Sequence, residues 1–384
     1  MRVMRKCVMI FLMAAGLSFL TSYALADWSP AKRLTWNSGW SRYPAMAVDS
    51  SGTVHVIWSD ETPGNYQIYY KRSTDGGTTW DAIRRLTWTS GGSYEAAIAV
   101  DSGQAVHIVW YEYTPGNNEI GYKRSTDGGT TWAAVQYLTS TLGGSFSPSI
   151  AVDTTGAVHV VWYDDTVGND EIYYRGSPDG GKTWTAVQRL SWTSGGSEGT
   201  AIDSGDALHV VFSDDTPGNY ELYHKRSPDG GATWVAKKRL TWNSGSSYSP
   251  VLALDSTSNV HVIWFDHTPG NFEVYYRKSP DGGTTWSAMK RLTWNSGGSS
   301  NPAMAIGAGD SIHAVWADDT SENYEIYYRR SPDEGTTWNA VQRLTWTSGA
   351  SSNPAIDIDS SGTIHVVWQD YLTGNYEIYY KKGN

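Results

Sequence analysis

One interval dominates this 384-residue sequence: a histidine that returns about every 52 residues. The spacings are 52, 52, 50, 52, 52 and 52 residues along the series His55, His107, His159, His209, His261, His313 and His365. A constant period of this length over nearly the whole chain is typical of a repeat architecture and argues against several unrelated domains. The sequence therefore predicts seven units.

Each unit contains four short runs of strand-forming residues. In the first unit they are 44–49, 53–58, 66–71 and 82–88, rich in Val, Ile, Tyr and Trp and separated by Gly, Pro, Asn and Asp. No stretch shows the helical period. Seven such units predict an all-β fold, a seven-bladed β-propeller of four-stranded antiparallel blades. An open solenoid would need terminal repeats with one polar face, and the sequence has none.

An octapeptide lies between the third and fourth runs of six units. The first copy spans Ser73 to Trp80, and Ser, Asp, Gly, Thr and Trp keep their places in all six. Its aspartates are Asp75, Asp127, Asp179, Asp229, Asp281 and Asp333. The Asp accepts hydrogen bonds from the N–H groups of a tight turn, glycine permits positive φ, and Trp caps the hairpin with an apolar face. We expect these residues to be structural.

The two ends of the chain predict how the ring closes. The seventh unit stops at Asn384, where its octapeptide would follow, whereas Trp28 and Trp36 precede Trp80 and Trp88 by 52 residues. The N-terminal segment should therefore supply the outer strand of the last blade and remove two exposed sheet edges.

Residues 1–26 differ in kind from the rest. Three basic residues precede an apolar run over 8–20, and a small-x-small motif ends at Ala26, which predicts a secretory signal peptide cleaved near Ala26. Residues 27–384 then form a single propeller domain, secreted or periplasmic, that lacks cysteine because Cys7 lies in the signal. The net charge is −10 and becomes −13 without Arg2, Arg5 and Lys6, which disfavours nucleic acid and membranes as partners. We expect a monomer.

The five fixed positions of the octapeptide resemble the Asp-box, or BNR repeat, of sialidases and other secreted propellers. The resemblance covers essentially all of residues 27–384 and implies a structural box between the third and fourth strands. Sialidases have six blades, three arginines that hold the substrate carboxylate, and an Arg-Ile-Pro-like motif. This chain has seven units and no such motif, so it resembles the seven-bladed, non-sialidase members more closely.

The loops after the second and fourth strands should share one face, which we expect to be the binding face. Its loops are acidic, with recurring pairs such as Asp164-Asp165 and Asp214-Asp215, and Arg42 is their one arginine. An arginine triad for sialic acid cannot be assembled from them. Among the loops, the one that holds Trp40, Arg42 and Tyr43 is the strongest asymmetric binding candidate.

Two repeated features leave alternatives open. The tryptophans after the fourth strands, among them Trp88 and Trp242, suit either stacking on sugar rings or packing between blades. The register histidines are interpreted as blade-to-blade hydrogen-bonding residues and not as a metal ring.

The functional hypothesis is a non-enzymatic propeller that binds a glycan or an extracellular protein. A sialidase-like or other glycoside hydrolase and a structural scaffold in a surface or periplasmic assembly are the alternatives. The acidic pairs suit an acid and a base for hydrolysis, but they recur in blade after blade, as turn formers do. No cofactor and no metal ligand are predicted, although the oxygen-rich loops leave a calcium site open.

Overall fold

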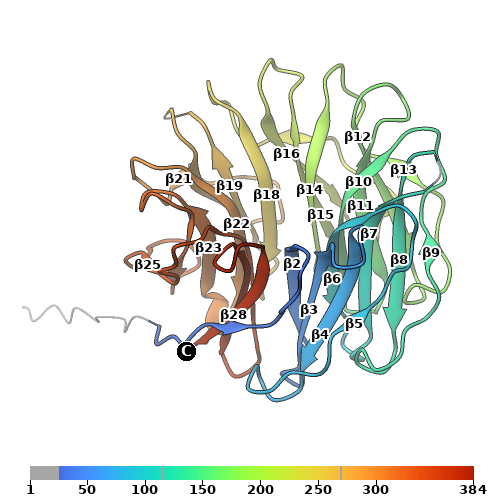
Figure 1. Cartoon of the computed structure of the whole chain (residues 1–384). Coiled ribbons are helices and arrows are strands. Elements are labelled where there is room, and N and C mark those ends of the chain that lie inside the picture. The colour runs from blue at the N-terminus through green and yellow to red at the C-terminus, as the bar shows by residue number, and fades with distance from the viewer. Residues whose placement is uncertain (1–25, 115, 269) are drawn as a thin grey trace, which may run out of the picture.

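A computed structural model describes residues 26–114, 116–268 and 270–384, which form seven four-stranded antiparallel sheets arranged in a ring (Figure 1). The predicted signal peptide lies outside the described residues except for Ala26. Within the described part of the chain, the sole helical element is a 3₁₀ turn, η1 (Ala308–Asp310). The prediction of an all-β, seven-bladed propeller is confirmed.

The strands of each blade follow one another from the central axis outwards. Blade 1 contains β2 (Ser41–Val48), β3 (Val54–Asp60), β4 (Gln67–Ser73) and β5 (Arg84–Arg85). Blade 2 contains β6 (Ser93–Val100), β7 (Val106–Tyr113), β8 (Asn118–Ser125) and β9 (Gln136–Tyr137). Blade 3 contains β10 (Ser145–Val152), β11 (Val158–Asp164), β12 (Glu171–Ser177) and β13 (Gln188–Arg189). Blade 4 contains β14 (Ser197–Ser204), β15 (Leu208–Asp214), β16 (Glu221–Ser227) and β17 (Lys238–Arg239). Blade 5 contains β18 (Ser247–Leu254), β19 (Val260–Asp266), β20 (Glu273–Ser279) and β21 (Lys290–Arg291). Blade 6 contains β22 (Ser299–Ile306), β23 (Ile312–Asp318), β24 (Glu325–Ser331) and β25 (Gln342–Arg343). Blade 7 contains β26 (Ser351–Ile358), β27 (Ile364–Asp370), β28 (Glu377–Gly383) and, from the other end of the chain, β1 (Lys32–Arg33).

The hydrophobic core lies between neighbouring blades. Strand β3 is buried over its whole length, and the apolar residues on the two sides of each blade pack against the two adjoining blades. In one such cluster, Ile57 and Tyr70 of blade 1 pack with Ile108 and Trp110 of blade 2. Each fourth strand is shorter than the sequence pattern predicts. Only two of its residues form register pairs with the third strand.

The N-terminal segment closes the ring as predicted. In blade 7 the strand order is β26-β27-β28-β1, with Lys32 opposite Tyr380 and Arg33 opposite Tyr379. Trp28 forms a further bridge to Gly383. The Arg33 guanidinium lies 2.6 Å from the Glu377 carboxylate, so the two ends of the chain are held by backbone pairing and by an ion pair.

The octapeptide turns have the structure expected of Asp-boxes. Asp75 Oδ1 accepts a hydrogen bond from the Thr79 amide at 2.7 Å, and its Oδ2 accepts one from the Thr79 hydroxyl at 2.6 Å. The Gly77 amide donates to Ser73 Oγ at 2.8 Å. These hydrogen bonds to the charged carboxylate hold the pKa of Asp75 well below its usual range. The box fastens the hairpin between the third and fourth strands.

The register histidines bond within their own blade, so the prediction of a blade-to-blade hydrogen bond is wrong. The bond joins His55 Nδ1 to the Tyr70 hydroxyl at 2.8 Å, and five other blades repeat it. The tyrosine, in turn, reaches the next blade, where Tyr70 packs edge-on against Trp132 with ring centroids 5.1 Å apart. A Cβ on Gly129 would lie 2.0 Å from the Tyr70 hydroxyl. The absence of a side chain at this glycine of the Asp-box therefore leaves space for the tyrosine.

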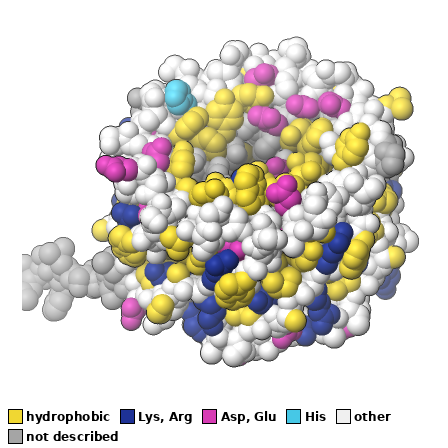
Figure 2. Space-filling view, viewed as in Figure 1, with side chains coloured by type: hydrophobic (Ala, Val, Ile, Leu, Met, Phe, Trp, Pro, Cys, Tyr) yellow, Lys and Arg dark blue, Asp and Glu magenta, His cyan; other side chains and the backbone are white. Residues whose placement is uncertain are grey.

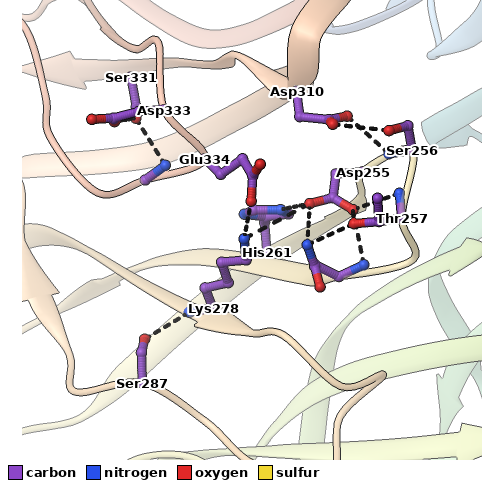
Figure 3. Close-up of polar contacts among 12 residues, drawn as sticks. Asp255, Ser256, Thr257, His261, Lys278, Ser287, Asp310, Ser331, Asp333 and Glu334 are labelled. Carbon is purple, nitrogen blue, oxygen red and sulfur yellow. Dashed lines mark hydrogen bonds and ion pairs between the residues drawn. The ribbon is translucent and has the colours of Figure 1, made fainter.

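Further polar contacts surround this histidine in blade 5 (Figure 3). The other ring nitrogen of His261, Nε2, lies 3.0 Å from Asp255, whose carboxylate also accepts hydrogen bonds from the turn between β18 and β19. Lys278 forms an ion pair with Glu334 in the Asp-box of blade 6. Blade 5 is thus tied to blade 6 by an ion pair at the box end as well as through its apolar face.

Deleting residues 27–36 should lower the melting temperature of the protein by at least about 10 °C. The deletion removes β1, the Arg33–Glu377 ion pair and the buried side chain of Leu34, and so costs several kcal/mol of unfolding free energy. Thermal denaturation followed by circular dichroism measures the effect. Trp36→Ala is the control, because this side chain is 65% exposed; a deletion variant that melts with the control would contradict closure by this segment.

Blade 4 carries His224 where the other blades carry tyrosine, and His224→Tyr should make the protein more resistant to acid. Burial lowers the pKa of His209 to about 4 and that of His224 well below its ordinary value. The unfolded chain takes up these protons first, near pH 6.5, so stability is lost as the pH falls below 6.5. The gain in melting temperature should therefore be larger at pH 5 than at pH 7.5.

The matched variant for this test is Tyr276→His in blade 5, which should introduce the same acid sensitivity. Equal pH dependence of the wild type and both variants would contradict the role of the histidine pair.

Candidate ligand-binding site

The innermost strand of every blade is interrupted by a β-bulge near its first residues. In β2 the register runs from Arg42 opposite Ser59 to Ala45 opposite Ile57, which leaves an extra residue on the inner strand. The third residue of each inner strand takes a left-handed φ between 44° and 60°. These residues are Tyr43, Glu95, Ser147, Gly199, Ser249, Asn301 and Asn353. Six are not glycine, although this conformation costs an ordinary residue about 1–2 kcal/mol.

The seven bulge residues surround a pocket on the axis of about 360 Å³. The residues that follow them complete its wall: Pro44, Ala96, Pro148, Thr200, Pro250, Pro302 and Pro354. Because each inner strand starts from the loop after a fourth strand, the pocket opens on the predicted binding face. Figure 2 shows a hollow on this axis, ringed by hydrophobic and acidic side chains.

The ring of bulge residues breaks the symmetry of the molecule. Ser147 donates a hydrogen bond to Glu95 Oε2 at 2.6 Å, and Asn301 donates to the side-chain oxygen of Asn353. Gln369 accepts from the Tyr43 amide at 2.9 Å and from Asn353 Nδ2 at 3.3 Å. No lysine or arginine is among the described residues that line the pocket. The site therefore offers hydroxyl, amide and aromatic groups and one carboxylate.

A series of contacting aromatic rings extends over blades 1 to 3 beside this pocket. Successive ring centroids lie 5.3–5.6 Å apart along the series Tyr66, Tyr94, Tyr111, Phe146 and Tyr163. Burial, with a contribution from the charge of Glu95, raises the pKa of Tyr111 well above its usual range. The Tyr111 hydroxyl stays protonated and remains a hydrogen-bond donor at neutral pH.

An acidic cluster lies between blades 3 and 4. Burial raises the pKa of Asp170, and the nearby charges of Asp165, Asp164 and Asp215 raise it further. The pKa of Glu198 is raised first by burial and then by the charge of Asp170. This side of the face repels anions and attracts hydroxyl donors or cations.

The residues of the loop predicted as the best binding candidate do not lie together: Tyr43 is at the pocket, and Trp40 and Arg42 are outside it. Tyr43 is half-exposed and lines the pocket. The Arg42 guanidinium instead lies between two rings, 4.1 Å from the centroid of Trp40 and 4.3 Å from that of Tyr376, and neither Trp40 nor Arg42 lines the pocket. These two residues join blade 1 to blade 7.

The four predicted acidic residues bond within the loops. Asp164 is buried and accepts a hydrogen bond from Ser145, and Asp214 is buried beside Lys237 at 2.6 Å. The other member of each pair accepts a hydrogen bond from a glycine amide of the neighbouring loop: Asp165 from Gly144 and Asp215 from Gly196. They shape the rim of the binding face.

Trp88 and Trp242 lie on the outer wall, apart from the axial pocket, and are 67% and 62% exposed. The sequence left open whether such tryptophans pack between blades, and their exposure shows that most of each side chain is outside the core. The tryptophans that end the second strands, such as Trp58 and Trp110, are the ones buried between blades.

Sequence reasoning missed Glu95, Asn301 and Asn353. The available signal was variation: this position holds five residue types in seven units, whereas the position three places later is Met, Ile or Leu in every unit. The bulge itself has no consistent local signature, since Tyr, Glu and Ser occupy four of the seven positions and do not favour left-handed backbone.

Across residues 26–114, 116–268 and 270–384, no group of three or more His, Cys, Asp or Glu side chains is arranged to hold a metal ion. Nor does any helix in those segments have the length and apolarity needed to cross a membrane.

With this fold and site, comparison with known proteins gives the family. The model of the BNR repeat-like domain family matches residues 18–262, and the chain belongs to this family. No curated protein matches the sequence.

Several solved structures share the fold at low identity. A protein of unknown function from Dyadobacter fermentans is 14% identical with a TM-score of 0.59, over 92% of this chain and 99% of that one. The intramolecular trans-sialidase from Ruminococcus gnavus is 13% identical with a TM-score of 0.55, over 92% and 97%. A PL25 ulvan lyase is 10% identical with a TM-score of 0.62, over 91% and 95%. At such identities the likeness concerns the fold and not the activity.

Ser249→Val should lower the unfolding free energy by about 1–2 kcal/mol, because a β-branched residue tolerates a left-handed φ poorly. Ser249→Gly, which adopts this φ freely, should change it by less than about 0.5 kcal/mol. Urea denaturation measures both variants. Since Ser249 is exposed, a stable Ser249→Val variant would contradict the bulge and not merely report on packing.

Proposed function

We propose that this protein is a secreted, non-catalytic propeller that binds a neutral glycan in its axial pocket. The observation that carries the proposal is the break in symmetry: seven equivalent, strained positions around one pocket hold five different residue types. Strained backbone that is kept around a cavity is a common feature of functional sites. The signal peptide predicted over 1–26 supports a location outside the cytoplasm.

The chemistry of the lining favours a sugar. The pocket volume of about 360 Å³ lies within the range of small-molecule sites, roughly 300–1,000 Å³. Asn301, Asn353, Ser147 and Glu95 offer donors and acceptors suited to hydroxyl groups, and Tyr43 offers an aromatic face. A concave pocket of this size suits a small ligand better than the flat surface of a folded protein.

The same lining argues against catalysis on acidic or neutral sugars. A glycoside hydrolase needs two carboxyl groups at a set separation, and Glu95 is the one carboxylate among the described residues that line the pocket. A sialidase needs cations for the substrate carboxylate, and Arg42 is held between Trp40 and Tyr376 outside the lining.

A glycan array tests this proposal, followed by calorimetry with the best neutral glycan. Glu95→Gln and Tyr43→Ala should each weaken binding by at least about 10-fold, because they remove a hydrogen-bond acceptor and a stacking face. Ser256→Ala, in the turn between β18 and β19 on the opposite face, is the control and should bind like the wild type. Equal affinities of all variants, or turnover of a fluorogenic sialoside, would overturn the proposal.

A further inference from the structure

Six tryptophans at equivalent positions on the outer wall are largely exposed. Each follows the fourth strand of a blade and exposes 62–68% of its surface: Trp36, Trp88, Trp192, Trp242, Trp294 and Trp346. A single exposed aromatic residue is ordinary. The same exposed residue at six equivalent places is a repeated feature of the surface. The seventh equivalent position holds Ser140.

Each of these rings lies beside two cations. One is an arginine of the same fourth strand, and the other is a lysine or arginine on the third strand of the next blade, with 5.5–5.9 Å between the cationic centre and the ring centroid. For Trp88 the two are Arg85 and Lys123. Lys123 is held in place by donating to the Leu86 carbonyl at 2.9 Å. The grooves thus combine a flat apolar face with positive charge.

The groove at Trp88 carries more positive charge than the other five. In those, the fourth-strand arginine is paired with a buried glutamate at 2.6–2.9 Å: Arg33–Glu377, Arg189–Glu171, Arg239–Glu221, Arg291–Glu273 and Arg343–Glu325. In blade 1 the glutamate is replaced by Gln67, and no described carboxylate lies within ion-pair distance of Arg85. One substitution therefore leaves a cation without its counter-charge.

This groove is also roomy and has a third basic residue. It encloses about 530 Å³ between the outer strand of blade 1 and the Asp-box of blade 2, and Arg84 and Trp132 line it together with Trp88. Arg84 donates one N–H to the Thr130 carbonyl, which positions its guanidinium at the wall. Asp81, which lies nearby in the sequence, is paired with Arg72 and is not among the lining residues.

We propose that the groove between blades 1 and 2 binds an acidic polysaccharide. One sugar ring stacks on Trp88, while its carboxylate or sulfate is held by Arg85 and Lys123. Figure 2 shows Lys and Arg side chains gathered with hydrophobic ones on the outer wall, while acidic side chains surround the hollow. The other five grooves bind the same ligand more weakly.

This site is separate from the axial pocket and takes a ligand of opposite chemical character. The pocket lining holds a carboxylate and no cation, whereas the groove lining holds three cations and no carboxylate among the described residues. Glu95→Gln should therefore leave binding in the groove unchanged, so each proposal succeeds or fails on its own variants.

The test is calorimetry on the full chain with three short probes of equal length: a heparin oligosaccharide, an oligogalacturonate and a malto-oligosaccharide. The two acidic probes carry sulfate and carboxylate respectively, and the neutral probe controls for stacking alone. The titrations use the Tyr43→Ala variant, in which binding to the axial pocket is weakened and the groove is intact. We expect an acidic probe to bind to it and the neutral probe not to bind, with affinity falling as salt rises. Which acidic probe binds more tightly identifies the anionic group.

Three variants separate stacking from charge. Trp88→Ala should weaken binding at least 10-fold, and Gln67→Glu, which installs the residue that five other grooves have, should weaken it about 5- to 10-fold. Trp242→Ala is the matched control in a groove that has its glutamate, and it should change the affinity less than 2-fold. Glu221→Gln should raise the number of tight sites from one to two.

Three outcomes would overturn the proposal. They are equal binding of neutral and acidic probes, unchanged binding by both Trp88→Ala and Gln67→Glu, and tighter binding of a short DNA duplex than of either acidic probe. The melting temperature of each variant is measured alongside. Gln67→Glu reproduces an arrangement that folds in neighbouring blades, so its result does not depend on a damaged fold.

Discussion

The contact on which the ring depends is that of an aromatic side chain of one blade with the Asp-box of the next. Seven such contacts close the circle, with ring centroids 4.9–5.3 Å apart, and they run from Tyr70 on Trp132 around to Tyr380 on Trp80. The histidine orients the tyrosine, the box glycine gives it room, and the box tryptophan covers it. The Asp-box thus joins blades as well as fastening a hairpin. Where the sixth blade needs such a partner, Trp28 from the N-terminal segment supplies it for Tyr328.

Sequence alone predicted the parts of the structure that repeat. A period of 52 residues gives the number of blades, and the offset of Trp28 from Trp80 gives the closure, because both depend on spacing along the chain. The partner of the histidine was predicted wrongly, since His55 and Tyr70 are 15 residues apart and pair across neighbouring strands of one blade. Spacing identifies equivalent positions, but it does not show whether their side chains bond within their own blade or to the next blade.

The axial pocket could not be predicted, for a different physical reason. Tyr43, Glu95 and Ser147 adopt a left-handed backbone that none of them prefers, so the fold and not the local sequence imposes the bulge. Residues 52 apart then meet around one axis. Of the predicted residues, Tyr43 lines this pocket. The guanidinium of Arg42, its neighbour in the chain, lies between the rings of Trp40 and Tyr376 instead. The bulge at Tyr43 interrupts the strand, so Tyr43 faces the axis while Arg42 packs between Trp40 and Tyr376, and the predicted binding loop serves two separate places.

Repetition and asymmetry divide the surface into two kinds of site. Around the axis the seven blades contribute different side chains to one cavity, so one ligand meets all of them at once. On the outer wall the blades contribute nearly the same tryptophan and cations to separate grooves, so the arrangement suits a polymer with regular charges. In that nearly uniform series, Gln67 is the informative departure: it removes a buried negative charge and leaves the exposed tryptophan unchanged. The Gln67 amide also donates hydrogen bonds to the Thr89 and Gly91 carbonyls, so the side chain stays bonded in the loop while Arg85 lacks the counter-charge that the other fourth-strand arginines have.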